Sequence, residues 1–266
     1  IEPVSLDEAY LDVTENKFGL ASATEVAQAI RQQIWQQMQL TASAGVAPNK
    51  FLAKIASDQN KPNGLFVVKP KVAEQFVESL AIEQFFGVGK VTAKVMHQMG
   101  IKTGWDLKQR SENELVSVFG KAGHIYYQNA RAIDYRPVES QRIRKSISSE
   151  TTFDRDIDSL DELAVELDAV ARDTFDYLQK KKFKGRTVTL KIKYADFKII
   201  TRSRTFADAV EDYESFYKAG FELLKLVDLS PKVRLIGLGV KNSDDEMGWY
   251  DAVQLRINFE EDETKG

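Results

Sequence analysis

The stretch RTVTLKIKYADFKIITRSRTF, residues 186–206, contains two runs rich in the β-branched and aromatic residues that favour strands. In the first run, apolar side chains alternate with polar ones, a period of two that is typical of a strand with one buried face. We therefore expect residues 186–194 and 198–206 to pair as neighbouring strands of one sheet.

Strand and helix patterns continue on both sides of this pair. Residues 142–153 indicate a strand, and residues 159–181 indicate a long helix with Ser159 as its N-cap. A second helical pattern covers 211–227, and a strand pattern covers 233–241. The order β-α-β-β-α-β predicts a four-stranded sheet with two helices on one face. We expect the basic side chains of the strands to lie on the open face.

The N-terminal half is organised differently. Residues 1–68 alternate strand and helix patterns, and residues 1–13 have the composition of a core strand. Residues 69–137 contain only short helical patterns separated by glycine-containing turns. The predicted fold class is therefore α+β and multidomain. The predicted divisions are a mixed α/β part (1–68), a helical part (69–137), a linker (138–142), a sheet domain (143–243) and an acidic tail (244–266).

The composition is that of a globular protein, with 43% hydrophobic and 29% charged residues among 266. The absence of cysteine excludes disulfides and thiolate metal sites, and it suits a reducing, cytoplasmic compartment. No apolar run reaches the roughly 18 residues of a membrane span, so we expect no membrane partner. Because Ile1 already lies within a strand pattern, we expect the natural protein to extend further toward its N-terminus.

The net charge of −3 hides a strong local asymmetry. Residues 180–204 contain ten Lys and Arg and one acid, whereas residues 244–266 contain eight acids and two bases. Binding to a polyanion depends on local patches more than on the total charge. The basic stretch therefore indicates a nucleic-acid surface, with an ordinary solvated face as the alternative.

Two adjacent carboxylates interrupt the apolar run VSLDEAYLDV, residues 4–13. A regular strand would send Asp7 and Glu8 to opposite faces, whereas a tight turn would let them converge. Convergent carboxylates repel each other, and a hard divalent ion such as Mg²⁺ relieves that repulsion. The alternative is a pair of solvated carboxylates at a hairpin tip.

A short glycine turn opens the segment FFGVGKVTAKVMHQMGI, residues 85–101. Gly87 and Gly89 directly precede a helical pattern that begins at Lys90, an arrangement that aims backbone N–H groups at an anion. With apolar residues on both sides, the segment resembles a helix-hairpin-helix motif that holds DNA phosphates. A purely structural turn is the alternative.

The acidic tail contains the run QLRINF, residues 254–259. Its apolar residues have no evident core to enter, and an extended peptide of this kind docks into a groove on a partner. A last edge strand of the sheet domain is the alternative.

Five segments, in order and spacing, resemble the Y-family translesion DNA polymerases of the bacterial DinB (DNA polymerase IV) group. They are SLDEAYLDVT (5–14), TASAGVAPNKFLAKIASDQNKPNG (41–64), GVGKVTAKVMHQMGI (87–101), RKSISSETTF (144–153) and LKIKYADFKIITRSRTF (190–206). The resemblance covers nearly the whole chain. It implies the C-terminal part of a palm (1–68), a thumb (69–137) and a little finger domain (143–243).

The resemblance also implies an active site. Asp7 and Glu8 would be catalytic and would hold two Mg²⁺ ions that activate a primer 3′-hydroxyl and hold the triphosphate. Lys61 matches a family lysine that neutralises the triphosphate of the incoming dNTP, with Lys50 and Lys54 as weaker candidates.

The other implied contacts are with DNA and with a sliding clamp. QLRINF resembles the clamp-binding motif of the family, which would supply processivity by tethering. The residues implied to contact primer-template DNA are Gly87, Gly89, Lys90, Lys145, Ser146, Arg202 and Arg204, and those implied to contact the clamp are Gln254, Leu255, Ile257 and Phe259.

The chain departs from the family pattern in two respects. The first metal-ligand Asp, the residue that excludes ribonucleotides and the fingers all precede the SLDE segment in the family and have no counterpart here. Phe86 stands where the family usually has Pro. We therefore predict part of a monomeric, error-prone polymerase of the DNA-damage (SOS) response that by itself binds DNA without polymerising. The rivals are a non-catalytic duplex-binding module and a clamp-docking protein.

Overall fold

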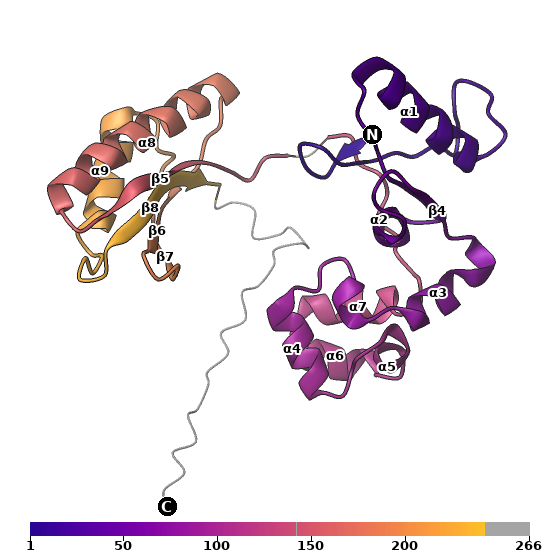
Figure 1. Ribbon diagram of the computed structural model, residues 1–266. Coiled ribbons are helices and arrows are strands. Elements are labelled where there is room, and N and C mark those ends of the chain that lie inside the picture. The colour runs from indigo at the N-terminus through magenta and orange to yellow at the C-terminus, as the bar shows by residue number, and fades with distance from the viewer. Residues whose placement is uncertain (142, 243–266) are drawn as a thin grey trace, which may run out of the picture. The chain divides into compact units, whose positions relative to one another are not determined.

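The computed structural model describes residues 1–141 and 143–242 (Figure 1). The chain divides into two compact units, whose described parts are residues 1–141, the first unit, and residues 143–242, the second unit. Each unit has its own hydrophobic core. Within the described ranges, no helix is both long and apolar enough to cross a membrane.

The first unit contains two small strand pairs and a series of helices. The hairpin β1 (Glu2–Pro3) and β2 (Ala9–Tyr10) is antiparallel, and β3 (Ala44–Val46) pairs in parallel with β4 (Leu65–Val67). The helical elements are α1 (Ala23–Met38), α2 (Lys50–Gln59), η1 (Pro70–Val72), α3 (Ala73–Ser79), η2 (Ile82–Gln84), α4 (Lys90–Gln98), α5 (Gly104–Lys108), α6 (Glu112–Phe119) and α7 (Lys121–Asn129). The parallel pair is joined through α2, as a crossover connection requires.

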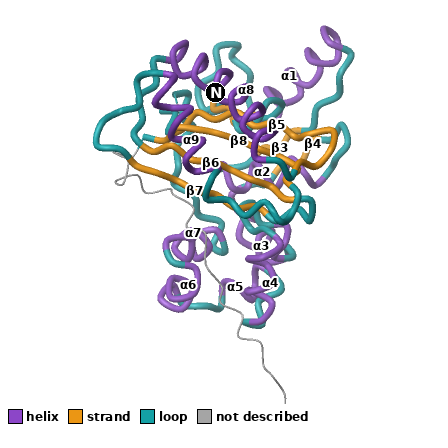
Figure 2. Tube along the Cα trace, turned by 90° about the vertical axis from the view of Figure 1, so that its left-hand side faces the viewer, coloured by secondary structure: helices purple, strands orange, loops and turns teal. Residues whose placement is uncertain are grey.

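The core of the first unit begins at α2 and continues through α7, where the short helices group together (Figure 2). Phe51, Leu52 and Ile55 of α2 are buried together with Ile82, Met96 and other residues from the later helices. Residues on both sides of position 68 therefore share one core.

The expectation of a buried strand over residues 1–13 is wrong. None of these residues is buried, and Leu6 is fully exposed. The hairpin has two residue pairs, Glu2 with Tyr10 and Pro3 with Ala9, and its large apolar side chains Ile1, Val4, Leu6 and Leu11 are exposed. The apolar composition of residues 1–13 is therefore not enough to predict that they are buried.

The second unit has the predicted order β-α-β-β-α-β. Its elements are β5 (Ser146–Ile157), α8 (Leu160–Lys181), β6 (Thr187–Tyr194), β7 (Ile199–Thr205), α9 (Tyr213–Leu224) and β8 (Val233–Lys241). The strands form one sheet in the order β5-β8-β6-β7, with every neighbouring pair antiparallel. The Ser159 hydroxyl caps α8 by accepting a hydrogen bond from the Glu162 N–H, as predicted. Both helices cover the same face of the sheet (Figures 1 and 2).

Candidate functional site

Asp7 and Glu8 lie at the tip of the β1–β2 hairpin. The backbone N–H groups of Val4 and Ser5 donate to the Glu8 carbonyl oxygen, at 2.9 and 3.3 Å, and close a tight turn. The Asp7 carboxylate is exposed and accepts a 2.6 Å hydrogen bond from the Ser5 hydroxyl, which lowers the pKa of Asp7. A turn at this pair is therefore present.

Glu8 faces α2 rather than Asp7. Its Oε1 atom lies 2.8 Å from Lys54 Nζ, and Lys54 Nζ also lies 3.8 Å from Asp58 Oδ2. Asp58 also bonds Lys61 at 2.5 Å, and this hydrogen bond raises the pKa of Lys61. Glu8, Lys54, Asp58 and Lys61 thus form a row of alternating charge, which we call the charge row.

The helix α2 holds this row in place because its opposite face is buried. Asn49 caps the helix by accepting from the Leu52 N–H, and Phe51, Leu52 and Ile55 pack in the core. Lys54 and Asp58 are separated by one helical turn and lie on the same side of the helix. The core therefore fixes where the two charges point.

Lys50 does not join the charge row. Its ammonium group bonds the Glu2 carboxylate at 2.7 Å and lies 5.6 Å from the centre of the Tyr10 ring. The two weaker candidates for triphosphate binding therefore have different partners: Lys54 bonds Glu8, whereas Lys50 bonds Glu2 at the base of the hairpin.

The donor chemistry of Asp7 and Glu8 suits Mg²⁺, which prefers carboxylate oxygens. The two carboxylates nevertheless do not converge, because one bonds Ser5 and the other bonds Lys54. Among residues 1–141 and 143–242, no group of three or more His, Cys, Asp or Glu side chains could hold a metal ion. Asp7 and Glu8 therefore do not make a metal site by themselves.

The glycine turn is formed as predicted. Gly87 has φ +92°, which a side chain would strain, and Gly89 is the N-cap of α4 without any side-chain cap. A Cβ atom at either glycine would meet nothing within 4 Å, so the backbone of the turn faces open space. Lys90, the first residue of α4, is exposed beside it.

The sheet of the second unit presents a face that is rich in hydroxyl groups. Thr187 and Thr205 share a 2.9 Å hydrogen bond across β6 and β7, and Thr189 and Ser203 share one of 2.8 Å. Ser146 opposes Lys241 at one end of the same face. The central strand β8 contributes the glycines Gly237 and Gly239 there, opposite Glu150 and Ser148 of β5.

Lys191 and Lys193 of β6 lie on this open face, as expected, but Arg202 and Arg204 do not, which corrects our expectation for the two arginines. They oppose Leu190 and Val188, both buried under the helices, and directly opposed residues point to the same side of a sheet. Both arginines are exposed because β7 is the edge strand. Lys145 lies just before β5, where its carbonyl oxygen accepts from the Asn242 N–H.

Two further points concern what the sequence predicted. Asp58 was not among the candidates, although it lies four residues after Lys54 on α2, a spacing typical of ion pairs, and three residues before Lys61, which follows the end of that helix. The clamp-binding candidates Gln254, Leu255, Ile257 and Phe259 lie outside the described residues.

Two family models match the chain. Residues 1–58 match the impB/mucB/samB family, and residues 144–252 match the impB/mucB/samB family C-terminal domain.

Curated relatives match over almost the whole chain. The DNA polymerase IV of Bacteroides fragilis is 48% identical over 98% of this chain and 72% of its own length. The DNA polymerase IV 2 of Agrobacterium fabrum is 46% identical over 97% of this chain and 73% of its own length.

Solved structures are similar as well. A Y-family DNA polymerase chimera, Dbh-Dpo4(243-245)-Dbh, superposes with a TM-score of 0.79 at 31% identity, covering 91% of this chain and 70% of the chimera. The insertion ternary complex of Dbh DNA polymerase gives 0.51 at 28% identity, over 82% of this chain and 63% of the other.

Proposed function

This chain belongs to the Y-family DNA polymerases of the DNA polymerase IV group, and from this premise we propose that it serves error-prone translesion synthesis. In that reaction a primer is extended opposite damaged template by nucleotidyl transfer. The observation that carries the proposal is the position of Asp7 and Glu8 at a hairpin tip, against a helix that bears Lys54 in the charge row. Carboxylates beside cations are the groups that phosphoryl transfer requires.

Asp7 and three residues of the charge row, Glu8, Lys54 and Lys61, have roles in this proposal. Asp7 and Glu8 supply carboxylates to the catalytic centre, and Lys61 binds the triphosphate as a mobile point charge. Because Lys61 bonds Asp58 and Lys54 bonds Glu8, both lysines exchange a carboxylate for a phosphate when a nucleotide binds. When bound, Mg²⁺ supplies Lewis-acid chemistry, lowering the pKa of the primer hydroxyl and neutralising charge on the triphosphate.

The DNA contacts fall in both units. Gly87, Gly89 and Lys90 present an open turn, a helix N-terminus and a cation to a phosphate. In the second unit, Ser146 on the hydroxyl face and Lys145, Arg202 and Arg204 near the sheet position the duplex without reading its bases. In family terms the first unit comprises palm (1–68) and thumb (69–137), and the second unit is the little finger domain.

We also propose that residues 1–266 alone bind primer-template DNA without extending it. Glu8 is neutralised by Lys54, so the hairpin tip offers little net negative charge to two divalent ions. The test combines fluorescence anisotropy on a primer-template duplex with a primer-extension assay in Mg²⁺ and dNTPs. We expect salt-sensitive binding and no extension, and robust extension by these residues would contradict the second part.

The catalytic role of Asp7 is tested in a polypeptide that carries these residues and extends primers. Asp7→Ala should abolish extension and leave the dissociation constant for DNA unchanged, because Asp7 is exposed and its hydrogen bonds within residues 1–141 and 143–242 are with the neighbouring Ser5. Ser5→Ala is the matched control and should retain extension. Full extension by Asp7→Ala would favour the rival function.

That rival is a non-catalytic module that grips duplex DNA, and the ion pair between Glu8 and Lys54 favours it, because a paired carboxylate needs no metal. A third possibility rests on Gln254, Leu255, Ile257 and Phe259 as a segment that docks on the sliding clamp. If the chain serves as a polymerase, deleting residues 254–259 should shorten the products made per binding event while distributive synthesis continues. The clamp-docking function instead predicts that the same deletion removes all function.

A further inference from the structure

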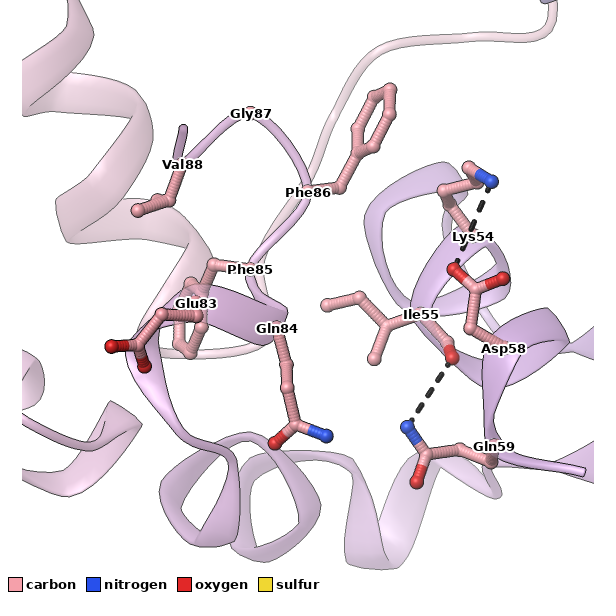
Figure 3. Close-up of a pocket in the computed structure, with 10 residues that line it drawn as sticks. All are labelled: Lys54, Ile55, Asp58, Gln59, Glu83, Gln84, Phe85, Phe86, Gly87 and Val88. Carbon is pink, nitrogen blue, oxygen red and sulfur yellow. Dashed lines mark hydrogen bonds and ion pairs between the residues drawn. The ribbon is translucent and has the colours of Figure 1, made fainter. Parts of the chain in front are cut away.

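A cleft of about 550 Å³ in the first unit lies between α2 and the segment that leads into the glycine turn (Figure 3). Ile55 and Phe85, both buried, provide an apolar floor. Phe86 stands at the rim with 42% of its surface exposed, and Lys54 Nζ lies 5.9 Å from the centre of its ring. The cleft thus combines an apolar floor, an aromatic face and a cation.

Two carboxamides complete the lining of the cleft. Gln84 Oε1 accepts a 2.9 Å hydrogen bond from the Ala81 N–H, which leaves its NH₂ group to donate, and Figure 3 shows this nitrogen turned toward Gln59. Gln59 uses its Nε2 atom in a long 3.4 Å contact with the Ile55 carbonyl, which leaves its Oε1 atom to accept. The cleft thus offers a donor on Gln84 and an acceptor on Gln59, the two kinds of group that bond the edge of a nucleobase.

The acids that line the cleft already have partners. Asp58 bonds Lys61, and Glu83 bonds His97 with its carboxylate directed away from the cleft (Figure 3). A phosphate that enters at Lys54 therefore meets no unpaired carboxylate of the lining.

We propose that this cleft binds a single unpaired nucleobase of the primer strand, stacked on Phe86 and held at its edge by Gln59 and Gln84. The inference rests on the proposed function. A strand whose 3′ end lies at Asp7 and Glu8, and whose phosphates are held by the Gly87 turn, passes the cleft between them. A paired base faces its complement, so only an unpaired base turns into the cleft. The site would let the polymerase tolerate a primer that is misaligned by one nucleotide.

The experiment compares two duplexes for binding to residues 1–266. One carries an extra, unpaired 2-aminopurine in the primer strand close to its 3′ end, and the other carries the same base paired with thymine. We expect the unpaired duplex to bind about fivefold more tightly, the lower end of what one base–aromatic stack contributes, with quenching of the 2-aminopurine fluorescence. An unpaired base in the template strand should give no such preference.

The variants separate stacking from general affinity. Phe86→Ala should abolish the preference, Phe86→Leu should retain little of it, and Gln59→Leu should reduce it. Trp105→Ala is the matched control, because Trp105 is also exposed, at 52%, and has Lys108 Nζ 6.0 Å from its ring, but it does not line the cleft. Thermal unfolding of each variant should match that of the original protein, which excludes misfolding.

The possible results distinguish failure of the nucleobase site from failure of the proposed DNA-binding function. Equal affinity for the two duplexes, or a preference that survives Phe86→Ala, overturns the nucleobase site while DNA binding stands. A preference that is the same for either strand overturns the assignment to the primer. Failure to bind either duplex overturns the proposed DNA-binding function itself.

Discussion

Asp134 joins two distant parts of the first unit. Its Oδ2 atom accepts a 3.0 Å hydrogen bond from the Phe51 N–H in the first turn of α2, and Arg136 holds the same carboxylate at 2.7 and 2.8 Å. The side chain of Asp134 is only 4% exposed. Asp134, which follows α7, therefore supplies a hydrogen-bond acceptor to a backbone N–H at the start of α2, the helix that carries Lys54.

Asp134→Asn should destabilise the first unit by roughly 2–3 kcal/mol at neutral pH, since it removes a buried, hydrogen-bonded charge and weakens the contact of this side chain with Arg136. Burial alone would raise the pKa of Asp134, but the bonds from Arg136 and from backbone N–H groups lower it below its usual 3.8. The stabilisation is therefore fully present above about pH 4 and is lost as the pH falls through the lowered folded-state pKa.

Urea unfolding at a series of pH values measures this effect. The original protein and Asp134→Asn should differ most near neutral pH and converge in acid. Asp12→Asn is the control, because Asp12 is an exposed carboxylate whose hydrogen bonds in the described part of the chain are with nearby Thr14. A constant difference at every pH would show that the charge of Asp134 is not responsible.

Adjacent residues of β7 should contribute to DNA binding in different ways. Arg202 and Arg204 carry charge on the helix side, whereas Ser203 carries a hydroxyl on the open face. Replacing either arginine by Gln should weaken binding and reduce the slope of log K against log salt by about one, because one phosphate contact releases about one counterion. Ser203→Ala should weaken binding without changing the slope.

Fluorescence anisotropy with a duplex of fixed sequence measures the binding constant at a series of salt concentrations. Lys145→Gln should lower the affinity and the salt slope as the arginine variants do. Arg172→Gln on α8 is the control, since that arginine already pairs with Asp168 in the helical layer. Unchanged slopes for Arg202, Arg204 and Lys145 together would place the duplex on another surface.

At the scale of the element, β8 depends on its glycines for a close approach to β5. A Cβ atom built on Gly239 would lie 2.6 Å from the Ser148 Cβ atom, and one on Gly237 would lie 2.9 Å from the Glu150 Cβ atom. Contacts this short force the strands apart. The two glycines therefore leave room on the open face for the Ser148 and Glu150 side chains of β5.

Gly239→Val should destabilise the second unit by about 1–3 kcal/mol, because the new side chain overlaps Ser148. Ser148→Gly in the same chain should recover part of that loss, since it removes the atom that is struck. Chemical unfolding of the two single variants and the double variant gives the coupling energy. Additive losses would mean that the overlap with Ser148 is not the cause.

At the scale of the whole molecule, the separate cores predict independent unfolding of the two units. Calorimetry should resolve two transitions, of which Asp134→Asn lowers one and Gly239→Val lowers the other. A single transition that both variants shift equally would contradict independence.

The order of elements in the second unit could be predicted because each one carries a strong local pattern, such as the alternation over 187–194 and the capped helix after Ser159. The side of the sheet on which Arg202 lies could not be predicted, because a shift of one residue in register exchanges the two faces of a strand. The role of Asp134 depends on a contact across 83 residues, which no local pattern encodes. The position of Glu8 beside Lys54 likewise joins residues 46 apart.

The bond between Asp134 and the Phe51 N–H also has a consequence for the order in which the protein is made. Translation delivers α2 long before residue 134, and the Glu139 N–H that bonds Glu2 arrives later still. Until residues 134 and 139 have been made, the Phe51 N–H lacks its acceptor on Asp134, and the Glu2 carboxylate has Lys50 but not the Glu139 N–H as a partner. The hydrogen bonds that tie the start of α2 and the base of the hairpin to residues 134 and 139 can therefore be complete only after those residues have been made, although the hairpin itself is made much earlier.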